Sequence, residues 1–339
     1  MRTSATGASR QVPLATPDAA ARVHDWEVAG DAWGRAAADW SCLYEHYASE
    51  VLAAMLSDTD VGTSMLDVAC GAGLAIRQAR GNGADVAGID ASANLVELAR
   101  RRNPGVDIRL GSMFDLPWPD ASFDAVISVN GIWGGCEGAL REMRRVARPG
   151  ALCAISFWGA GPPLDMRLVF EVFARHSPSG HVDGMRSTNR IARPGAAEGM
   201  LVDAGFEVIR RGARVSTIEW PDPDLAWRAL ASGGPAPPAL DHADPTAIRR
   251  DVLAALRPMR DESGIVRFRN DPQFVVARVN PSECADLPDV EFRDPHAPGE
   301  GPTSCLCSSS NVSTPNNSSS TTRPTRAASS TNSDTRCGG

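Results

Sequence analysis

The apolar residues of this chain follow a helical spacing at first and then change to short runs separated by helical segments. Residues 21–57 place Trp33, Trp40, Leu43 and Tyr47 near one stripe, which predicts helix. Beyond this segment, apolar runs bounded by turn residues predict strands, and the stretches between them show helical spacing. The expected strands are residues 64–69, 85–90, 106–111, 123–129 and 151–157, and the expected helices are 74–80, 94–102 and 137–147.

Strands that are apolar on both faces and alternate with helices indicate a parallel sheet covered by helices. A helical insertion at residues 219–262 precedes the last expected strand. The ordered unit is expected to span residues 21–282. A polar leader (residues 1–20) and a tail rich in Ser, Thr, Asn and Pro (residues 283–339) are expected to be disordered, because such segments bury too little apolar surface.

The composition excludes several classes of function. All 34 basic residues are arginine, so a Schiff base or the phosphate-binding lysine of a P-loop is ruled out. The net charge of −7 argues against a nucleic-acid-binding surface. We find no apolar stretch of roughly 20 residues and no secretion signal, so we expect no membrane insertion and a cytoplasmic protein. The abundance of Ala, Gly, Pro and Arg is typical of a bacterial genome of high GC content.

The segment from Met65 to Leu74 is the most informative part of the sequence. A predicted strand runs into Cys70-Gly-Ala-Gly73, a turn whose glycines let a ligand approach the backbone, before a helix whose first N–H groups are free. Asp90 ends the second strand, where a carboxylate suits the hydroxyls of a ribose. Together these features predict a nucleotide-like cofactor at the carboxyl ends of the strands.

Two kinds of cofactor compete for this turn. A nicotinamide or flavin dinucleotide requires a third glycine, where Ile76 stands, and its pyrophosphate disfavours the nearby carboxylate of Asp67. S-adenosylmethionine has no phosphate, and its sulfonium and ammonium groups favour that carboxylate. The pattern therefore favours S-adenosylmethionine, with a NAD-dependent oxidoreductase as the alternative.

Four segments in this order, LDVACGAG, GIDAS, DLPWPDASFDAVIS and EMRRVARPG, resemble the successive motifs of class I S-adenosylmethionine-dependent methyltransferases. The similarity is to the methyltransferase-11 type, which includes quinone-biosynthesis methyltransferases, and it is strongest over residues 60–160. It implies an α/β, Rossmann-like, doubly wound sheet of seven strands, mostly parallel with an antiparallel last strand and with helices on both faces. Residues 21–282 would form this methyltransferase domain.

The resemblance also assigns roles to residues at the ends of the strands. The methionine and ribose parts of the cofactor would lie at the glycine turn, the ribose hydroxyls at the acid that ends the second strand, and the adenine beside residues that follow the second and third strands. The cofactor-binding residues so implied are Asp67, Ala69, Cys70, Gly71, Gly73, Asp90, Ala91, Ser112, Met113 and Asn130, the last lying near the transferred methyl group. The family often has glycine at the position of Ala69 and usually aspartate at that of Ser112.

Methyl transfer from a sulfonium is an in-line displacement, so the protein must chiefly align the acceptor and exclude water. If the acceptor has to lose a proton, His46, Tyr47 and His176 are candidates for the base. No cluster of residues has the spacing of metal ligands, and we expect no metal. The fourth strand is followed by Asn130-Gly-Ile-Trp133 instead of Asn-Pro-Pro-Tyr, which disfavours methylation of nucleic-acid adenines or glutamine amides.

We therefore expect a small-molecule acceptor that reacts through an oxygen, nitrogen or carbon nucleophile. Residues 21–57, 158–190 and 219–262 would cover it. Tryptophans in and near these segments predict an apolar or aromatic compound; they are Trp133, Trp158, Trp220 and Trp227. A non-catalytic S-adenosylmethionine-binding regulatory protein is a further alternative, and the oligomeric state stays open.

Overall fold

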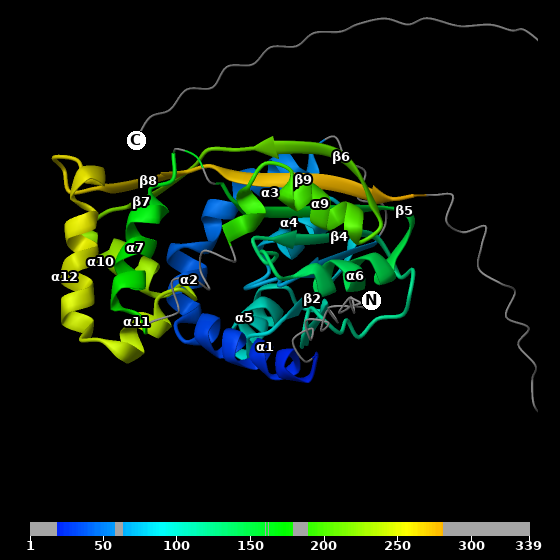
Figure 1. The fold of residues 1–339 in the computed structure, drawn as a ribbon, viewed down its shortest axis with the longest axis horizontal. Coiled ribbons are helices and arrows are strands. Elements are labelled where there is room, and N and C mark those ends of the chain that lie inside the picture. The colour runs from blue at the N-terminus through cyan, green and yellow to red at the C-terminus, as the bar shows by residue number, and fades with distance from the viewer. Residues whose placement is uncertain (1–18, 58–63, 160, 162, 179–188, 281–339) are drawn as a thin grey trace, which may run out of the picture. The chain divides into compact units, whose positions relative to one another are not determined.

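The computed structural model describes residues 19–57, 64–159, 161, 163–178 and 189–280. A seven-stranded sheet forms its centre, in the order β3-β2-β1-β4-β5-β9-β6 (Figure 1). The strands are β1 (Ser64–Val68), β2 (Asp85–Asp90), β3 (Asp107–Leu110), β4 (Phe123–Val129), β5 (Ala147–Trp158), β6 (Phe206–Ala213) and β9 (Pro272–Val279). All of the expected tail and nearly all of the expected leader lie outside the described residues, and the last two residues of that leader begin a helix.

The direction of each strand agrees with the expected topology. Strands β1 to β5 pair in parallel, whereas β9 runs antiparallel to both β5 and β6. The prediction of a mostly parallel seven-stranded sheet with an antiparallel last strand is therefore confirmed. From β1 the chain proceeds outward to β2 and β3, and then returns to place β4 on the other side of β1. Ligands of such sheets bind where the strand order reverses, here at the carboxyl ends of β1 and β4.

Helices cover both faces of the sheet, because successive residues of a strand point to opposite sides. Met65 of β1 packs in one core cluster with α3 (Ser49–Leu56), α4 (Leu74–Gly81) and α5 (Ala93–Arg102). Its neighbour Leu66 packs in a second cluster with α6 (Glu137–Val146) and α9 (Ala196–Asp203). This arrangement confirms the doubly wound fold.

The N-terminal helical region is broken into α1 (Ala19–Gly34), α2 (Ala37–Leu43) and a 3₁₀ turn, η1 (Glu45–Ala48), before α3. The aromatic residues expected in one stripe consequently separate: Trp33 meets Trp40 edge-on at 6.0 Å, whereas Tyr47 stacks on Trp158. In Figure 1, α1 and α2 run beside α5. A Cβ at Gly30 would lie 2.0 Å from the carbonyl oxygen of Ala91, so only glycine allows α1 to pack this closely on the turn after β2.

A second added region lies between β6 and β9. It contains β7 (Ser216–Trp220), α10 (Pro223–Ala231), α11 (Pro237–His242), α12 (Pro245–Ala255), η3 (Arg257–Met259) and β8 (Val266–Asn270), with β7 and β8 forming a separate antiparallel pair. Asp222 and Asp244 cap α10 and α12, each followed by proline at the first helical position, which is a favourable start for a helix. These helices pack with α7 (Met166–His176) at one end of the molecule (Figure 1).

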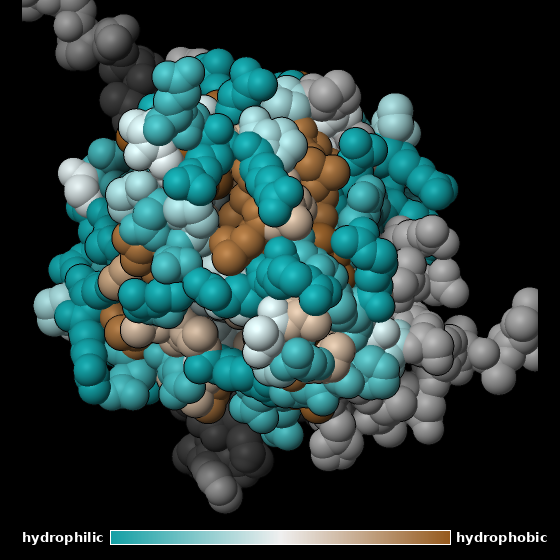
Figure 2. Space-filling view, turned by 90° about the vertical axis from the view of Figure 1, so that its left-hand side faces the viewer, coloured by the Kyte–Doolittle hydropathy of each residue, from teal (hydrophilic) through white to brown (hydrophobic). Residues whose placement is uncertain are grey.

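The face that carries these added helices is mainly hydrophilic, and its largest apolar patch lies above the centre of the view among hydrophilic side chains (Figure 2). The hydrogen bond from Trp220 Nε1 to the carbonyl of Leu43 (2.9 Å) joins the added region to the N-terminal helices. An ion pair between Arg228 and Asp39 makes a second connection. Within the described ranges, no helix is both long enough and apolar enough to cross a membrane.

Candidate cofactor site

The turn after β1 has an unusual backbone. Ala69, Gly71 and Gly73 all have positive φ angles, of 59°, 53° and 82°. Glycine adopts this conformation without strain, whereas an L-residue pays roughly 1–2 kcal/mol for it. The geometry therefore explains why the resembling family often has glycine where this chain has Ala69. The turn leads directly into α4, whose first N–H groups face the same edge of the sheet.

Asp90 joins the end of β2 to this turn. Its Oδ2 accepts a hydrogen bond from the amide of Gly71 and its Oδ1 accepts one from the amide of Ser92, both at 2.8 Å. Burial raises the pKa of Asp90, and the amides of Ser92, Gly71 and Ala91 counteract that rise. Each carboxylate oxygen keeps acceptor capacity for a further donor, which fits the two hydroxyls of a ribose.

Asp67 is a buried carboxylate of a different kind. It is 2% exposed, and its Oδ1 has no hydrogen-bond partner among the described residues. Burial raises its pKa well above the ordinary value, and the charges of Asp90 and Glu45 raise it further. An ionised carboxylate in this position needs a cation. The sulfonium and ammonium groups of S-adenosylmethionine fit this site, whereas a pyrophosphate would add negative charge to three carboxylates.

Two residues from the N-terminal helices lie over the glycine turn, and the sequence analysis did not place either in the cofactor site. Glycine has no Cβ, but a Cβ added to Gly71 would lie 2.8 Å from Cη2 of Trp40 and 3.8 Å from Oε1 of Glu45. Glu45 is 4% exposed. The only available signal in the sequence was a carboxylate between Tyr44 and Tyr47, the two tyrosines of the chain.

Asn130 follows β4 and meets Tyr47, one of the three candidates for a base. Its Nδ2 donates to the Tyr47 hydroxyl at 2.6 Å, and its Oδ1 accepts from Ser156 Oγ at 3.2 Å. The Tyr47 ring stacks on Trp158 with centroids 4.8 Å apart. Burial raises the pKa of Tyr47, so its phenol stays protonated at neutral pH. This hydroxyl is therefore suited to donating a hydrogen bond and poorly suited to removing a proton.

The other two candidates for a base occupy different surroundings. His46 is exposed on η1. His176 ends α7, and its Nε2 lies 2.9 Å from Oδ2 of Asp251 in α12, so it links two helices of the added region. Tyr47, by contrast, contacts Asn130, which the resemblance assigns to the cofactor site.

The remaining predicted residues lie at the same edge of the sheet. Ala91 follows β2, and Ser112 and Met113 follow β3. Because β2 and β3 are parallel neighbours, these residues lie beside one another. Ser112 Oγ accepts a hydrogen bond from the amide of Phe114 at 3.1 Å. Cys70 is buried, and burial raises the pKa of its thiol well above the usual range, which fits a packing role and not that of a nucleophile.

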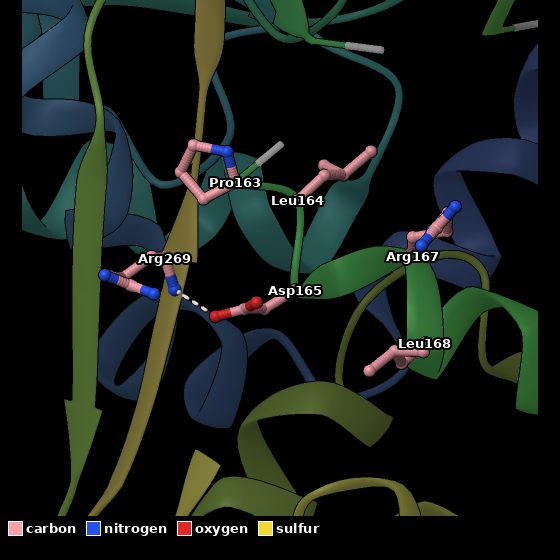
Figure 3. A pocket seen from close by; sticks show the side chains of 6 residues that line it. All are labelled: Pro163, Leu164, Asp165, Arg167, Leu168 and Arg269. Atoms are coloured by element: carbon pink, nitrogen blue, oxygen red, sulfur yellow. Dashed lines mark hydrogen bonds between the residues drawn. The ribbon is translucent and has the colours of Figure 1, made fainter. Parts of the chain in front are cut away.

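A surface hollow of about 430 Å³ lies at the start of α7 (Figure 3). Its lining residues are Pro163, Leu164, Asp165, Arg167, Leu168 and Arg269. Asp165 Oδ2 accepts a hydrogen bond from the Arg269 amide at 2.8 Å, which holds the beginning of α7 against β8. None of the predicted cofactor-binding residues lines this hollow. Over the described part of the chain, no three His, Cys, Asp or Glu residues are grouped so that they could hold a metal ion.

Residues 66–155, which contain the end of β1, the glycine turn, β2 to β4 and most of β5, match a family model described as "Methyltransferase domain". This segment is a methyltransferase domain. The predicted resemblance is therefore confirmed for the part of the chain that carries the motifs.

Several curated proteins named as methyltransferases are similar to part of this chain. A 2-phytyl-1,4-naphtoquinone methyltransferase of Trichormus variabilis is 35% identical over 128 residues, covering 34% of this chain and 56% of the relative. A demethylmenaquinone methyltransferase of Paenarthrobacter aurescens is 34% identical over 125 residues, covering 36% and 49%. A malonyl-[acyl-carrier protein] O-methyltransferase of Serratia marcescens is 33% identical over 102 residues, covering 30% and 40%. The chain thus spans about half the length of the curated relatives it matches.

Among solved structures, a putative methyltransferase from Bacillus halodurans is similar to this chain with a TM-score of 0.47 and 18% sequence identity. The similarity covers 68% of this chain and 99% of that chain.

Proposed function

We propose that the protein transfers a methyl group from S-adenosylmethionine to a small-molecule acceptor by in-line displacement. The observation that carries this proposal is the buried Asp67 carboxylate at the glycine turn, whose Oδ1 no described residue satisfies. The cationic donor supplies that partner and an electrophilic methyl group. A dinucleotide supplies neither, which disfavours the oxidoreductase alternative.

The residues of the chain would divide the work between binding and alignment. The Asp90 carboxylate holds the ribose hydroxyls, and the Gly71 and Gly73 backbone accommodates the methionine part. Tyr47 and Asn130, joined by a hydrogen bond, lie at the end of β4 and orient the acceptor. Because the reaction centre must exclude water, the aromatic pair of Tyr47 and Trp158 suits the wall of this site.

The acceptor is proposed to be an apolar or aromatic compound. The Tyr47–Trp158 stack beside Asn130 offers an aromatic surface, whereas the parallel pair of Tyr44 and Trp220 is buried in the core. Two of the relatives are named for quinone substrates, and a third is named for a malonyl group on a carrier protein. Planar aromatic walls favour the first kind of acceptor.

Calorimetric titration of the whole protein with S-adenosylhomocysteine and with NAD tests this proposal. We expect binding of S-adenosylhomocysteine and none of NAD. The Asp90→Ala variant should weaken that binding by roughly 1–3 kcal/mol through loss of charge-assisted hydrogen bonds. Asp85→Ala is the matched control, because Asp85 is exposed at the opposite end of the same strand.

Binding of NAD in place of S-adenosylhomocysteine would contradict the proposal. Turnover of a panel of quinols, phenols and carboxylic acids with methyl-labelled donor then separates an enzyme from a non-catalytic binding protein. A labelled product that depends on Asp90 supports the enzyme. Binding without any labelled product from that panel favours the regulatory alternative.

A further inference from the structure

Glu45 is an acidic residue buried beside the cofactor site although it comes from outside the sheet. It begins η1 and is 4% exposed. Its Oε1 lies 3.8 Å from the Cβ position of Gly71, so this oxygen points toward the turn where the methionine part of the donor is proposed to lie.

The two oxygens of this carboxylate have different surroundings. Oε2 contacts Nη2 of Arg77 at 3.3 Å and Nη1 of Arg102 at 3.2 Å. Oε1 has no hydrogen bond of ordinary geometry in the part of the chain that the structure describes, although the backbone amide of Ala72 is near enough to counteract the rise in the carboxyl pKa. The arginine side chains are partly buried, and their charges counteract the rise in the pKa of Glu45 that its burial causes. The arginines therefore hold Glu45 in place through Oε2 and offset part of its charge, while Oε1 stays turned toward the glycine turn.

Electrostatic coupling links Glu45 to the other two carboxylates of the site. Its charge is one of the causes that raise the pKa of Asp67, and Asp90 is another. Three buried carboxylates thus act on one small region. Two of them, Asp67 and Glu45, each present an oxygen that the described residues leave without a hydrogen bond. A positively charged ligand would give both carboxylates a favourable electrostatic partner.

We infer that Glu45 is a third carboxylate of the donor site and that it makes this site prefer the cationic donor to the neutral product. The inference rests on the proposed function. In the reaction the sulfonium gives up its methyl group, keeps the electron pair of the broken bond and becomes a neutral thioether. The acceptor supplies the electron pair of the new bond. Product formation therefore removes one positive charge from the neighbourhood of Glu45, which lowers the affinity for the product and favours its release.

The test compares the dissociation constants of S-adenosylmethionine and S-adenosylhomocysteine, measured by calorimetry in the absence of acceptor. The two ligands differ only in the methyl group and its charge. For Glu45→Gln we expect the preference for the donor over the product to fall about tenfold, because an enclosed charge interacts strongly with a nearby cation. Product affinity should change by less than about threefold, which also shows that the variant is folded.

Glu50→Gln is the matched control, because Glu50 is exposed in the first turn of α3, five residues away. It should leave both affinities unchanged. A Glu45→Gln protein whose donor-to-product preference stays within twofold of the original overturns the inference while leaving the proposed function intact. If the original protein binds neither ligand, the proposed function itself fails.

Discussion

The two regions that form the candidate site are built on different principles. The carboxyl ends of β1, β2 and β4 supply backbone geometry: positive φ angles at Ala69 and Gly71, and amides that hold Asp90. The segment from α2 to α3 supplies side chains, among them Trp40, Glu45 and Tyr47. The first region is specified by hydrogen bonds within the sheet, and the second by how helices dock on it.

This difference separates two tasks of the site. A strand end fixed by its neighbours can position a ribose and a methionine in the same way for many acceptors. A helical segment can change its side chains without altering the sheet, so it is suited to setting preference among ligands. Substitutions in the first region should therefore act on donor binding and substitutions in the second on selectivity and rate.

The largest effect is expected for Asp67→Asn, in the strand region. Removing the carboxylate should weaken donor binding by about 10–100-fold, because the cation loses its buried partner. The same substitution should raise the free energy of unfolding of the ligand-free protein. Asparagine cannot ionise, so the variant avoids the cost of an enclosed charge.

The sign of the pH effect follows from the raised pKa of Asp67. A carboxyl whose folded pKa exceeds its unfolded pKa stabilises the protein below the unfolded value, and this stabilisation is lost as the pH rises through the folded value. Asp67→Asn should thus be more stable than the original near pH 8 by about 1–3 kcal/mol and similar to it near pH 4. Calorimetric unfolding across this range measures the difference. A constant difference at all pH values would show that Asp67 does not titrate on unfolding.

The sheet region was predictable because local pattern and tertiary structure agree there. Short apolar runs at residues 64–69 and 85–90 predicted the first two strands. The glycines between β1 and α4 predicted the turn. Parallel pairing then brings these strand ends to one edge without further information. Even Ala69, which departs from the resembling family, adopts the backbone angle that a glycine would have.

The docking of the N-terminal helices could not be predicted in the same way. The helical spacing was read as one stripe, but the chain breaks after Gly34 and after Leu43. Glu45 and Tyr47 then face different parts of the site, because η1 turns more tightly than an α-helix. The packing of Gly30 on the carbonyl of Ala91 involves residues about 60 positions apart, and no local pattern indicates it.

A smaller effect is expected for Tyr47→Phe, in the helical region. The variant keeps the ring on Trp158 but removes the hydroxyl that accepts the Asn130 hydrogen bond. We expect kcat to fall about tenfold with little change in the KM for the donor, because the acceptor loses a positioning contact. Because the pKa of Tyr47 is raised by burial, the original enzyme should show no rise in rate from tyrosine ionisation below about pH 10.

Tyr44→Phe is the control for that variant. Tyr44 is also buried and stacks on an indole, but its hydroxyl contacts Met166 Sδ, at 3.8 Å, and not a strand end. Its kcat should stay within about twofold of the original. Equal losses of kcat in both variants would indicate that removing either buried hydroxyl disturbs this segment and that the Tyr47 hydroxyl has no separate role.

The smallest effect is expected for His176→Ala, which lies in neither of the two regions. The imidazole pairs with Asp251 across α7 and α12, and this contact lowers the pKa of the Asp251 carboxyl. Loss of a partly exposed hydrogen bond should slightly lower the thermal midpoint and leave kcat/KM within about twofold. A large fall in kcat with unchanged donor affinity would instead place His176 at the acceptor. The added helices would then form a third region of the catalytic site.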